Sequence, residues 1–522
     1  MIPTKNDQIR AYSSPSMDVY SSKKNTEAFQ CLAVGGTGGP HTKPLELWEP
    51  DFVEVLRSSR RSGGIGGSSS GRDRALYRTP ESRALQQCKN DIQKEDRWDD
   101  FKKITNPFEY VFLSWNRRSS RSVSTRQPLS RSYFKMIEMW KTAELGRILE
   151  PLIAADGGLV TAHSAEGPGG FIEACWEHAA KSGHEVKNSF AITLRSEARN
   201  VPGWRKAVRF LQDHPQIQIC DGEDGTGNIL VKPNQDFFVN LVREAHPKGV
   251  HVYSADGGFD FSSDYNAQED VIFPLLLAES LLGIRVLAQG GCMIIKCFDT
   301  TERPTIDLLW LLSRCFREWT LVKPHTSRAG NAERYFIGKE FVGNVDDIVG
   351  ILEGMQERGA WNSPILSYGS VPEWKEWRDK LVSLQEQIES LEYRTIRKTL
   401  DLIRAHDFTK IRANVRENVQ RSLRWCEEFG EPVSNIWMCD FERSVTRETQ
   451  DLIGILSPEM ATNSHSWYNK AAAAAAAGTA PSQTSTLSFE GFRSGIQSAD
   501  AAQQVYPTGS NPFMRYNSIF KT

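Results

Sequence analysis

Residues 249–298 read GVHVYSADGGFDFSSDYNAQEDVIFPLLLAESLLGIRVLAQGGCMIIKCF, and this stretch decides the fold. It opens with an apolar run, Val250 to Ser254, which predicts a strand that stops just before Asp256. The apolar segment from Val271 to Ala288 is too long for a strand and contains charged residues, so it predicts an amphipathic helix ended by two glycines. Cys292 to Cys297 then predict a second strand, with Lys296 near its end.

A strand, a crossover helix and a strand predict a parallel pair of strands. Open parallel sheets bind their ligands beyond the carboxyl ends of the strands. Asp256 and Lys296 are therefore expected side by side at the edge of the sheet where chemistry takes place. The alternative interpretation is an ordinary salt bridge, and this stretch alone does not decide between the two.

Five further strands are predicted, and they share β-type apolar runs bounded by turn residues: the start of 158–170, Asn188–Leu194, Gln216–Cys220, 320–324 and Arg334–Lys339. Helical patterns alternate with them at 130–150, 171–183, Asp236–His246 and 302–319. Seven strands alternating with about six helices predict an α/β fold, a Rossmann-like doubly wound sheet with helices on both faces. The last two strands are expected to form an antiparallel hairpin at one edge.

The first of these strands runs into the glycine-rich turn Gly167 to Gly170. Glycines let the backbone approach a ligand closely, and the helix that follows offers its amide groups. The dinucleotide pattern G-x-G-x-x-G is absent, and a purely structural turn is the alternative. Asp221, Glu223 and Asp224 follow a later strand, where acids can hold a nucleoside cofactor or serve simply as turn residues.

Composition indicates a globular protein with polar ends. The 522 residues suffice for two or three domains, and a net charge of −2 does not by itself indicate a nucleic-acid-binding protein. The nine cysteines lack zinc-site spacing, the first residues lack the apolar core of a secretory signal, and no apolar run is typical of a membrane span. We expect an intracellular protein, cytoplasmic or nuclear, and whether it is cellular or virus-encoded stays open.

Four regions are expected: a flexible Ser/Gly/Arg-rich arm over 1–105, the α/β domain over 106–345, a helical extension over 346–455 and a low-complexity tail over 456–522. The extension is expected to pack on the sheet domain or on a protein partner. The tail is either disordered or a docking segment. A basic run comprising Arg117, Arg118, Arg121, Arg126 and Arg131 is either a phosphate-binding strip or a solvated linker.

Six motifs in order resemble the FtsJ-like methyltransferases, specifically the S-adenosylmethionine-dependent enzymes that methylate the ribose 2′-hydroxyl of the first transcribed nucleotide of capped mRNA. They are SRSYFK (130–135), GPGGF (167–171), GEDGTGNI (222–229), ADGGFDFS with NAQE (255–269), IIKCFD (294–299) and SRAGNAERYFIGKEF (327–341). The resemblance spans residues 128–341, under half of the chain.

The resemblance implies a role for twelve positions in this sequence. It places a Lys-Asp-Lys-Glu catalytic tetrad on Lys135, Asp256, Lys296 and Glu333. It implies S-adenosylmethionine as the cofactor, bound by Gly167, Pro168, Gly169, Gly170, Asp224 and Asp256. It implies capped RNA as the substrate, contacted by Arg131, Arg328 and Asn331. No metal and no membrane are implied.

The tetrad has its own physical logic. A ribose hydroxyl is a poor nucleophile at neutral pH, whereas a sulfonium methyl is already activated, so the enzyme needs positioning and a base. We expect Lys296 to be that base, with its pKa lowered from about 10.4 by burial and by the second ammonium of Lys135. Asp256 and Glu333 would orient it, although their charges act to raise its pKa.

One position departs from the family. The first strand of the family usually ends in an acid that helps to hold the methionine end of the cofactor, and here His163 stands in that place, with Ser164 and Glu166 nearby. Either neighbour could substitute, or cofactor binding is weak. Two alternatives to cap methylation therefore stay open: methylation of internal rRNA or tRNA ribose, and an inactive module that binds RNA or a protein.

Overall fold

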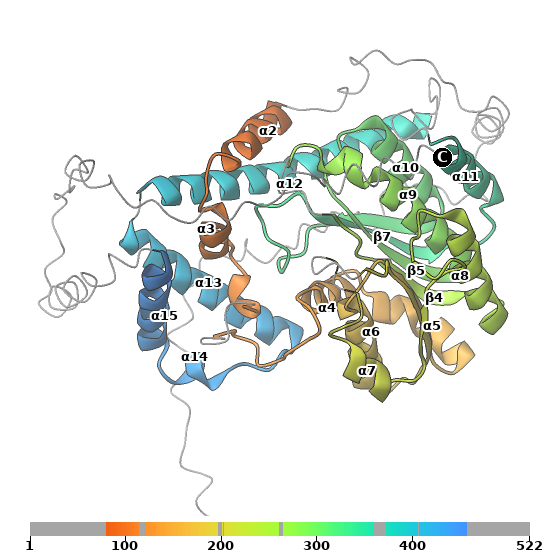
Figure 1. Cartoon of the computed structure of the whole chain (residues 1–522), viewed down its shortest axis with the longest axis horizontal. Helices are drawn as coiled ribbons and strands as arrows, with labels where there is room; N and C mark the ends of the chain where they lie inside the picture. Colours follow the sequence, from red (N-terminus) through yellow and green to blue (C-terminus); the bar gives the residue numbers. More distant parts are fainter. Residues whose placement is uncertain are drawn as a thin grey trace, which may run out of the picture. The chain divides into compact units, whose positions relative to one another are not determined.

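A single sheet of seven strands, in the order β3-β2-β1-β4-β5-β7-β6, lies at the centre of the fold in this computed structural model (Figure 1). The strands are β1 (Leu159–Ser164), β2 (Val186–Ile192), β3 (Ile217–Cys220), β4 (Val250–Ala255), β5 (Leu287–Cys297), β6 (Phe316–Val322) and β7 (Arg334–Phe341). β1 to β5 pair in parallel, and β7 is antiparallel to both β5 and β6. The predicted doubly wound α/β fold is confirmed, with β7 inserted between β5 and the edge strand β6.

The structure describes residues 80–113, 121–196, 201, 203–259, 265–359, 372–405 and 407–456. These residues belong to the first of two units, Met1–Pro458, and the second unit, Glu459–Thr522, lies outside the described residues. The predictions of a flexible arm and of a low-complexity tail fall largely on the residues that are not described. For residues 1–79 and 457–522 those predictions stay predictions.

Residues 249–298 form the predicted parallel pair of strands. Ser254 and Ala255 of β4 lie opposite Ile294 and Ile295 of β5, so that Asp256 and Lys296 follow at the same sheet edge. The connecting helix is α9 (Gln268–Val286), which ends earlier than predicted. Gly290 and Gly291 lie inside β5 rather than before it, where the register shifts against β4 and Gly290 has a φ of +83°. A bulge, not a helix stop, explains these glycines.

Helices cover both faces of the sheet because the strands direct alternate side chains to opposite sides. Met293 and Ile295 of β5 join one apolar core, whereas Cys292 and Ile294 join the other. The helices of the first core are α8 (Lys232–Ala245), α9, α10 (Arg303–Arg314) and α11 (Asp346–Arg358). Those of the second are α4 (Ser132–Thr142), α5 (Leu145–Asp156) and α6 (Gly170–Lys181), and α7 (Val208–Asp213) packs near β2 and β3.

The predicted helix over 302–319 is divided in the structure. α10 ends at Arg314, and β6 begins at Phe316 because this segment pairs with β7, with Phe316 opposite Phe341. The edge strand is therefore longer than the predicted strand over 320–324. Long-range pairing thus converts the end of a helical pattern into a strand.

Helices from both ends of the described chain pack on the sheet domain. The predicted extension over 346–455 contains α11 and, after it, α12 (Pro372–Ala405), α13 (Phe408–Phe429), α14 (Asn435–Cys439) and α15 (Phe441–Leu456). Trp374 and Trp377 of α12 contact Trp310 of α10 with ring centroids 5.6 and 5.2 Å apart. The second half of α12 belongs to the other core, so this one helix joins the two apolar clusters.

Part of the segment expected to be a flexible arm is helical. α2 (Pro80–Ile92) and α3 (Trp98–Thr105) bury Leu85 and Phe101, and in Figure 1 both lie along α12. A 3₁₀ turn follows at Glu109–Val111. The apolar partner of these helices comes from a segment far along the chain, so local composition could not indicate that residues 80–105 would fold.

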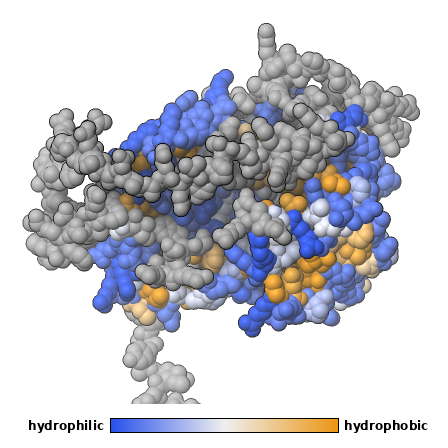
Figure 2. Space-filling view, in the orientation of Figure 1, coloured by the Kyte–Doolittle hydropathy of each residue, from blue (hydrophilic) through white to orange (hydrophobic). Residues whose placement is uncertain are grey.

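The visible surface is mainly hydrophilic, with separate apolar patches (Figure 2). Among the described residues, the exposed large apolar side chains are Val208, Phe237, Ile436 and Met438. None of the helices in the described part of the chain is both long enough and apolar enough to cross a bilayer.

Candidate active site

Four charged side chains from four different segments meet at the carboxyl end of the parallel strands. Lys296 Nζ lies 3.1 Å from Asp256 Oδ1 and also donates to the carbonyl oxygen of Asp256 at 2.8 Å. Lys135 Nζ, from α4, lies 2.8 Å from Glu333 Oε1 at the start of β7. The structure therefore brings together all four residues of the predicted tetrad as two ion pairs. Lys296 and Glu333 are each only 9% exposed, so solvent weakens these charges little.

Tyr335 joins the two ion pairs, and the sequence interpretation did not include it. Its hydroxyl lies 2.8 Å from Asp256 Oδ1 and 3.2 Å from Glu333 Oε1, and Lys135 Nζ donates to the same hydroxyl at 3.2 Å. Tyr335 lies opposite Lys296 in the pairing of β5 with β7. The sequence could have indicated that Tyr335 lies near the tetrad. Residues two apart on a strand point to the same side, as Glu333 and Tyr335 do here.

The charge state of Lys296 differs from the expectation. Burial opposes its charge, but the carboxylates of Asp256 and Glu333 outweigh burial, and the pKa of Lys296 is raised above its usual value. The predicted lowering of this pKa is therefore wrong for the protein without ligands. The reason is geometric, because the described contacts of Lys296 Nζ are with Asp256, whereas Lys135 is paired with Glu333.

A third, buried lysine donates hydrogen bonds to the turn that carries Glu333. Lys323, just after β6, is buried, and its Nζ donates to the carbonyl oxygens of Asn331 and Glu333 at 2.6 and 2.7 Å. Burial lowers the pKa of Lys323 to about 7. Burial also disfavours the charge on Glu333, yet the nearby lysines, Lys135 first, hold the pKa of Glu333 far below its usual range. Lys323 thus fixes the turn that presents Glu333.

The glycine turn between β1 and α6 is a cradle that only glycine can form. Gly169 has a φ of +100°, and a Cβ on Gly170 would lie 2.3 Å from the hydroxyls of Ser130 and Ser132. A Cβ on Gly167 would lie 3.0 Å from the backbone of Gly203. The turn leads directly into the amino terminus of α6, whose amide groups favour anionic and polar ligand groups. The groups that a Cβ would meet belong to the protein itself, so close packing accounts for these glycines, and the predicted contact of Gly167, Pro168, Gly169 and Gly170 with a cofactor stays a prediction.

Comparison with known proteins identifies this arrangement. The model of the FtsJ-like methyltransferase family matches residues 128–341, the range that contains the sheet, the glycine turn and the tetrad. The chain contains an FtsJ-like methyltransferase domain. The resemblance inferred from the six motifs is thereby confirmed for this domain.

The methyltransferase domain is similar to curated enzymes that act on mRNA caps. It is 32% identical over 191 residues to cap-specific mRNA (nucleoside-2′-O-)-methyltransferase 1 of Drosophila melanogaster, covering 36% of this chain and 23% of that protein. It is 38% identical over 188 residues to the human protein of the same name, covering 35% and 21%. The matched segment thus spans under a quarter of either relative.

Among solved structures, a ribosomal RNA methyltransferase from Plasmodium falciparum overlays with a TM-score of 0.29 at 17% identity, covering 41% of this chain and 99% of that one. This overlay is loose. The strand order and the match to the family carry the assignment of the fold instead.

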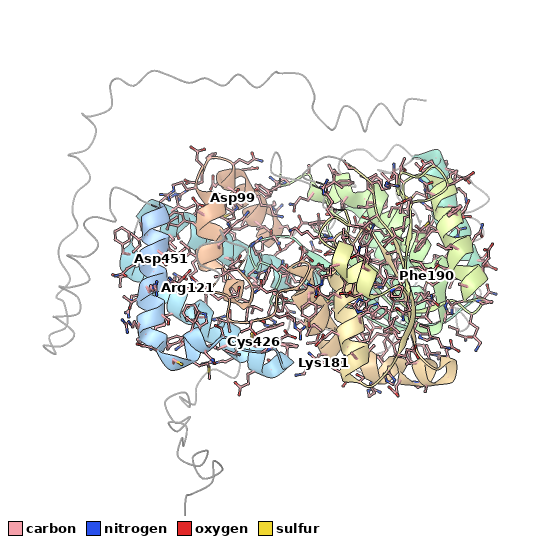
Figure 3. All side chains as sticks on the ribbon, turned by 60° about the horizontal axis from the view of Figure 1, so that its bottom comes forward. Asp99, Arg121, Lys181, Phe190, Cys426 and Asp451 are labelled. Atoms are coloured by element: carbon pink, nitrogen blue, oxygen red, sulfur yellow. The ribbon has the colours of Figure 1, made fainter. Side chains whose placement is uncertain are left out.

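Arginines that were candidates for a phosphate-binding strip are paired inside the methyltransferase domain and its extension. Arg121 pairs with Glu448 and with Asp451 of α15, which Figure 3 shows beside it, and Arg126 pairs with Glu177 and Glu431. The strip is therefore not formed by these members of the run, and Arg117 and Arg118 lie outside the described residues. Their partners come from distant segments, which the local sequence could not indicate.

Arg131 is likewise engaged by the protein itself. Its guanidinium donates to the carbonyl oxygens of Phe108, Phe112 and Thr326 at 2.8 to 3.2 Å, and it is largely buried. Arg131 therefore ties the segment 108–112 to Thr326, and its predicted contact with RNA stays a prediction.

Arg328 and Asn331 lie where the resemblance placed them, on the turn before β7. Arg328 makes a bidentate pair with Glu109 at 3.0 and 3.1 Å. Both residues line a pocket between this turn, the α2–α3 region and α12. The lining also includes Trp98, Tyr265, Glu392 and two lysines. Each basic group is paired with an acid of the protein: Lys89 with Asp299 and Glu392, Lys102 with Asp99, and Arg328 with Glu109.

Asp224 lies in the turn after β3, where its Oδ1 accepts hydrogen bonds from Thr226 N and Thr226 Oγ1 at 2.8 and 2.7 Å. These bonds lower the pKa of the Asp224 carboxyl. The alternative that Asp224 is a turn residue therefore accounts for the hydrogen bonds that its Oδ1 accepts. The carboxylate is exposed, so its predicted contact with a cofactor stays a prediction.

Proposed function

We propose that this chain transfers the methyl group of S-adenosylmethionine to the ribose 2′-hydroxyl of capped mRNA. The observation that carries the proposal is the convergence of Lys135, Asp256, Lys296 and Glu333, linked by Tyr335, at the carboxyl ends of the strands. A domain that only binds RNA gains nothing from burying two lysines against two carboxylates, because such pairs contribute little net stability.

The bound cofactor would supply an activated methyl group on a positively charged sulfonium. The residues of this chain would supply the rest. Lys296 would accept the proton of the ribose hydroxyl, and Asp256 would orient the Lys296 amine. For this step the raised pKa of Lys296 must fall, and Tyr335 contributes by donating its one proton to Asp256 or to Glu333, which weakens the attraction of that carboxylate for the ammonium.

Two segments would hold the substrates. Gly167, Pro168, Gly169 and Gly170 would hold the cofactor in the cradle before α6, with Asp224 and Asp256 on its nucleoside side. The pocket lined by Trp98, Tyr265, Arg328 and Asn331 would hold a nucleotide of the RNA, because aromatic faces stack on bases.

The names of the similar enzymes favour the mRNA cap over internal ribose positions as the target. On the same grounds we propose a place in mRNA processing, in the nucleus or the cytoplasm. A protein partner that binds through the helical extension or the tail stays a prediction. Methylation of internal rRNA or tRNA ribose is the second candidate, since the same tetrad would serve any ribose 2′-hydroxyl.

The experiment that tests this proposal measures transfer of labelled methyl groups to one RNA sequence with and without a cap. We expect transfer to the capped RNA only, and its loss in Lys296→Met. Lys339→Met is the matched control, because Lys339 also lies on the sheet but pairs with Glu318 away from the tetrad. Transfer to both RNAs would favour the second candidate. Cofactor binding without any transfer would identify an inactive module.

A further inference from the structure

A buried carboxylate on α4 binds the segment that leads from β6 to β7. Glu138 is fully buried and is not a member of the tetrad. Its Oε1 accepts hydrogen bonds from the backbone N and the Nδ1 of His325 at 2.5 and 2.8 Å. Its Oε2 accepts from the backbone N and the Oγ1 of Thr326, both at 3.1 Å, and from the Trp425 indole at 3.2 Å. Both oxygens are therefore engaged by the protein itself.

The Glu138 carboxylate is charged although it is buried. Burial alone would raise its pKa, but the His325 ring and the backbone amides of His325 and Thr326 outweigh burial and hold the pKa of Glu138 below its usual value. Glu138 in turn raises the pKa of His325, although burial of the ring opposes the charge. Removing the charge of Glu138 therefore leaves His325 without its counter-charge at 2.8 Å.

One face of α4 contacts the segment between β6 and β7 at both of its ends. Arg131, Lys135 and Glu138 are spaced by four and three residues, so they lie on the same face of the helix. Arg131 and Glu138 both bind the start of this segment at Thr326. Lys135, between them, pairs with Glu333 at the end of the segment at 2.8 Å. The contacts on either side of Lys135 thus fix where α4 presents this lysine to the tetrad.

Glu138 also connects the tetrad to the helical extension. Trp425 of α13 donates to Glu138, and its ring packs edge-on against Phe134 of α4 with centroids 5.8 Å apart. Phe134 directly precedes Lys135 in the chain. α13 therefore supports the helix that carries Lys135, although the tetrad itself comes from the methyltransferase domain.

We propose that Glu138 is a positioning residue for methyl transfer, which holds Lys135 at the distance from Glu333 that the reaction requires and makes α13 a support of the active site. The inference rests on the proposed function. The contacts favour this role over general stabilisation, because Glu138 binds the same segment that carries Glu333. A displacement of about 1 Å between reacting groups can lower a rate by about 100-fold.

The test compares Glu138→Gln with Glu431→Gln in the full chain. Glu431 is the matched control, because it is also a buried carboxylate that joins α4 to the extension, where it accepts from Tyr133 at 3.2 Å and pairs with Arg126 at 3.0 Å. Single-turnover kinetics measure methyl transfer to capped RNA. Calorimetry measures the affinity for S-adenosylhomocysteine, and urea unfolding measures stability.

We expect both variants to be less stable than the wild type, because each leaves a buried basic or polar partner without its carboxylate. Only Glu138→Gln should lose rate, by about 10- to 100-fold. The affinity for S-adenosylhomocysteine should stay within about threefold of the wild type in both. An unchanged rate in Glu138→Gln overturns the inference. An equal loss of rate in both variants overturns it as well, since that result indicates general damage.

Trp425→Phe decides the question if Glu138→Gln does not fold. It removes one donor to Glu138, and Trp437→Phe is its control, because that buried indole donates to the carbonyl oxygen of Arg121 instead. We expect a loss of rate of about three- to tenfold in Trp425→Phe alone. Equal rates in these two variants overturn the inference alone. A wild-type chain that methylates no RNA overturns the proposed function together with it.

Discussion

The hydroxyl of Tyr335 lies 2.8 Å from Asp256 Oδ1, so that β7 is tied across β5 to the end of β4. The same hydroxyl reaches Glu333 and accepts from Lys135. A phenol has one proton, so it can serve only one of the two carboxylates at a time. Tyr335 thus couples the two ion pairs of the tetrad.

Replacing Tyr335 with Phe removes this coupling and keeps the ring that packs beneath it. We expect the rate of methyl transfer in a single turnover to fall by about 10- to 100-fold, because hydrogen bonds to charged groups are lost. Affinity for S-adenosylhomocysteine should stay within about threefold of the wild type. Tyr110→Phe is the control, since that buried hydroxyl contacts Glu448 instead. Equal rates in Tyr335→Phe and the wild type would show that the coupling is irrelevant to transfer.

The pH dependence of the reaction should report the raised pKa of Lys296. A base must be deprotonated, and Asp256 and Glu333 favour the protonated form in the free protein. The kcat/KM for the cofactor should therefore rise steadily from pH 7 to pH 9, by about tenfold per pH unit, without a plateau. A profile that is flat over this range would contradict Lys296 as the base.

Lys323→Met tests the lysine that holds the Glu333 turn. Burial lowers the pKa of Lys323 to about 7 in the folded protein, against 10.5 for an unperturbed lysine. Between these values the unfolded chain binds more protons, so Lys323 makes the wild type more stable as pH rises. Urea unfolding at pH 6.5 and pH 9 should show a pH-dependent gain in the wild type that the variant lacks. Parallel pH dependence in both proteins would refute the low pKa.

Lys323→Met should also weaken methyl transfer more than cofactor binding. The variant loses the donors to the carbonyl oxygens of Asn331 and Glu333, and the turn with Arg328 lines the pocket that we propose for RNA. We expect a higher KM for RNA with little change in the affinity for S-adenosylhomocysteine. A change confined to cofactor affinity would place Lys323 elsewhere in the mechanism.

Lys89→Met tests whether α2 is part of the folded domain. Lys89 is buried and pairs with Asp299 at 2.8 Å and with Glu392 of α12 at 3.2 Å. Removing the lysine leaves two buried carboxylates without this partner, so we expect the free energy of unfolding to fall by roughly 3–5 kcal/mol. Lys94→Met, at an exposed position with a surface pair to Asp91, should change it by less than about 0.5 kcal/mol. Similar unfolding curves for both variants would contradict the attachment of α2 to the folded domain through the pairs of Lys89 with Asp299 and Glu392.

Sequence periodicity was sufficient for the strands, because alternation and length distinguish buried strands from amphipathic helices without knowledge of partners. It failed at Phe316, where pairing with Phe341 turned the end of a helical pattern into a strand. It also failed at Gly290, because a bulge and a helix stop both favour glycine. Both errors lie at positions where a distant strand determines the local conformation.

The parallel β4–α9–β5 unit and the order of the motifs followed from local pattern and spacing alone, and the tetrad residues were implied by the family resemblance that those motifs carry. The three-dimensional structure was needed to show that Tyr335 joins the tetrad, that neighbouring carboxylates raise the pKa of Lys296, and that Arg121, Arg126 and Arg131 face the protein. The physical reason is that charge, pKa and hydrogen bonding depend on neighbours within a few ångströms, and folding draws those neighbours from distant parts of the chain.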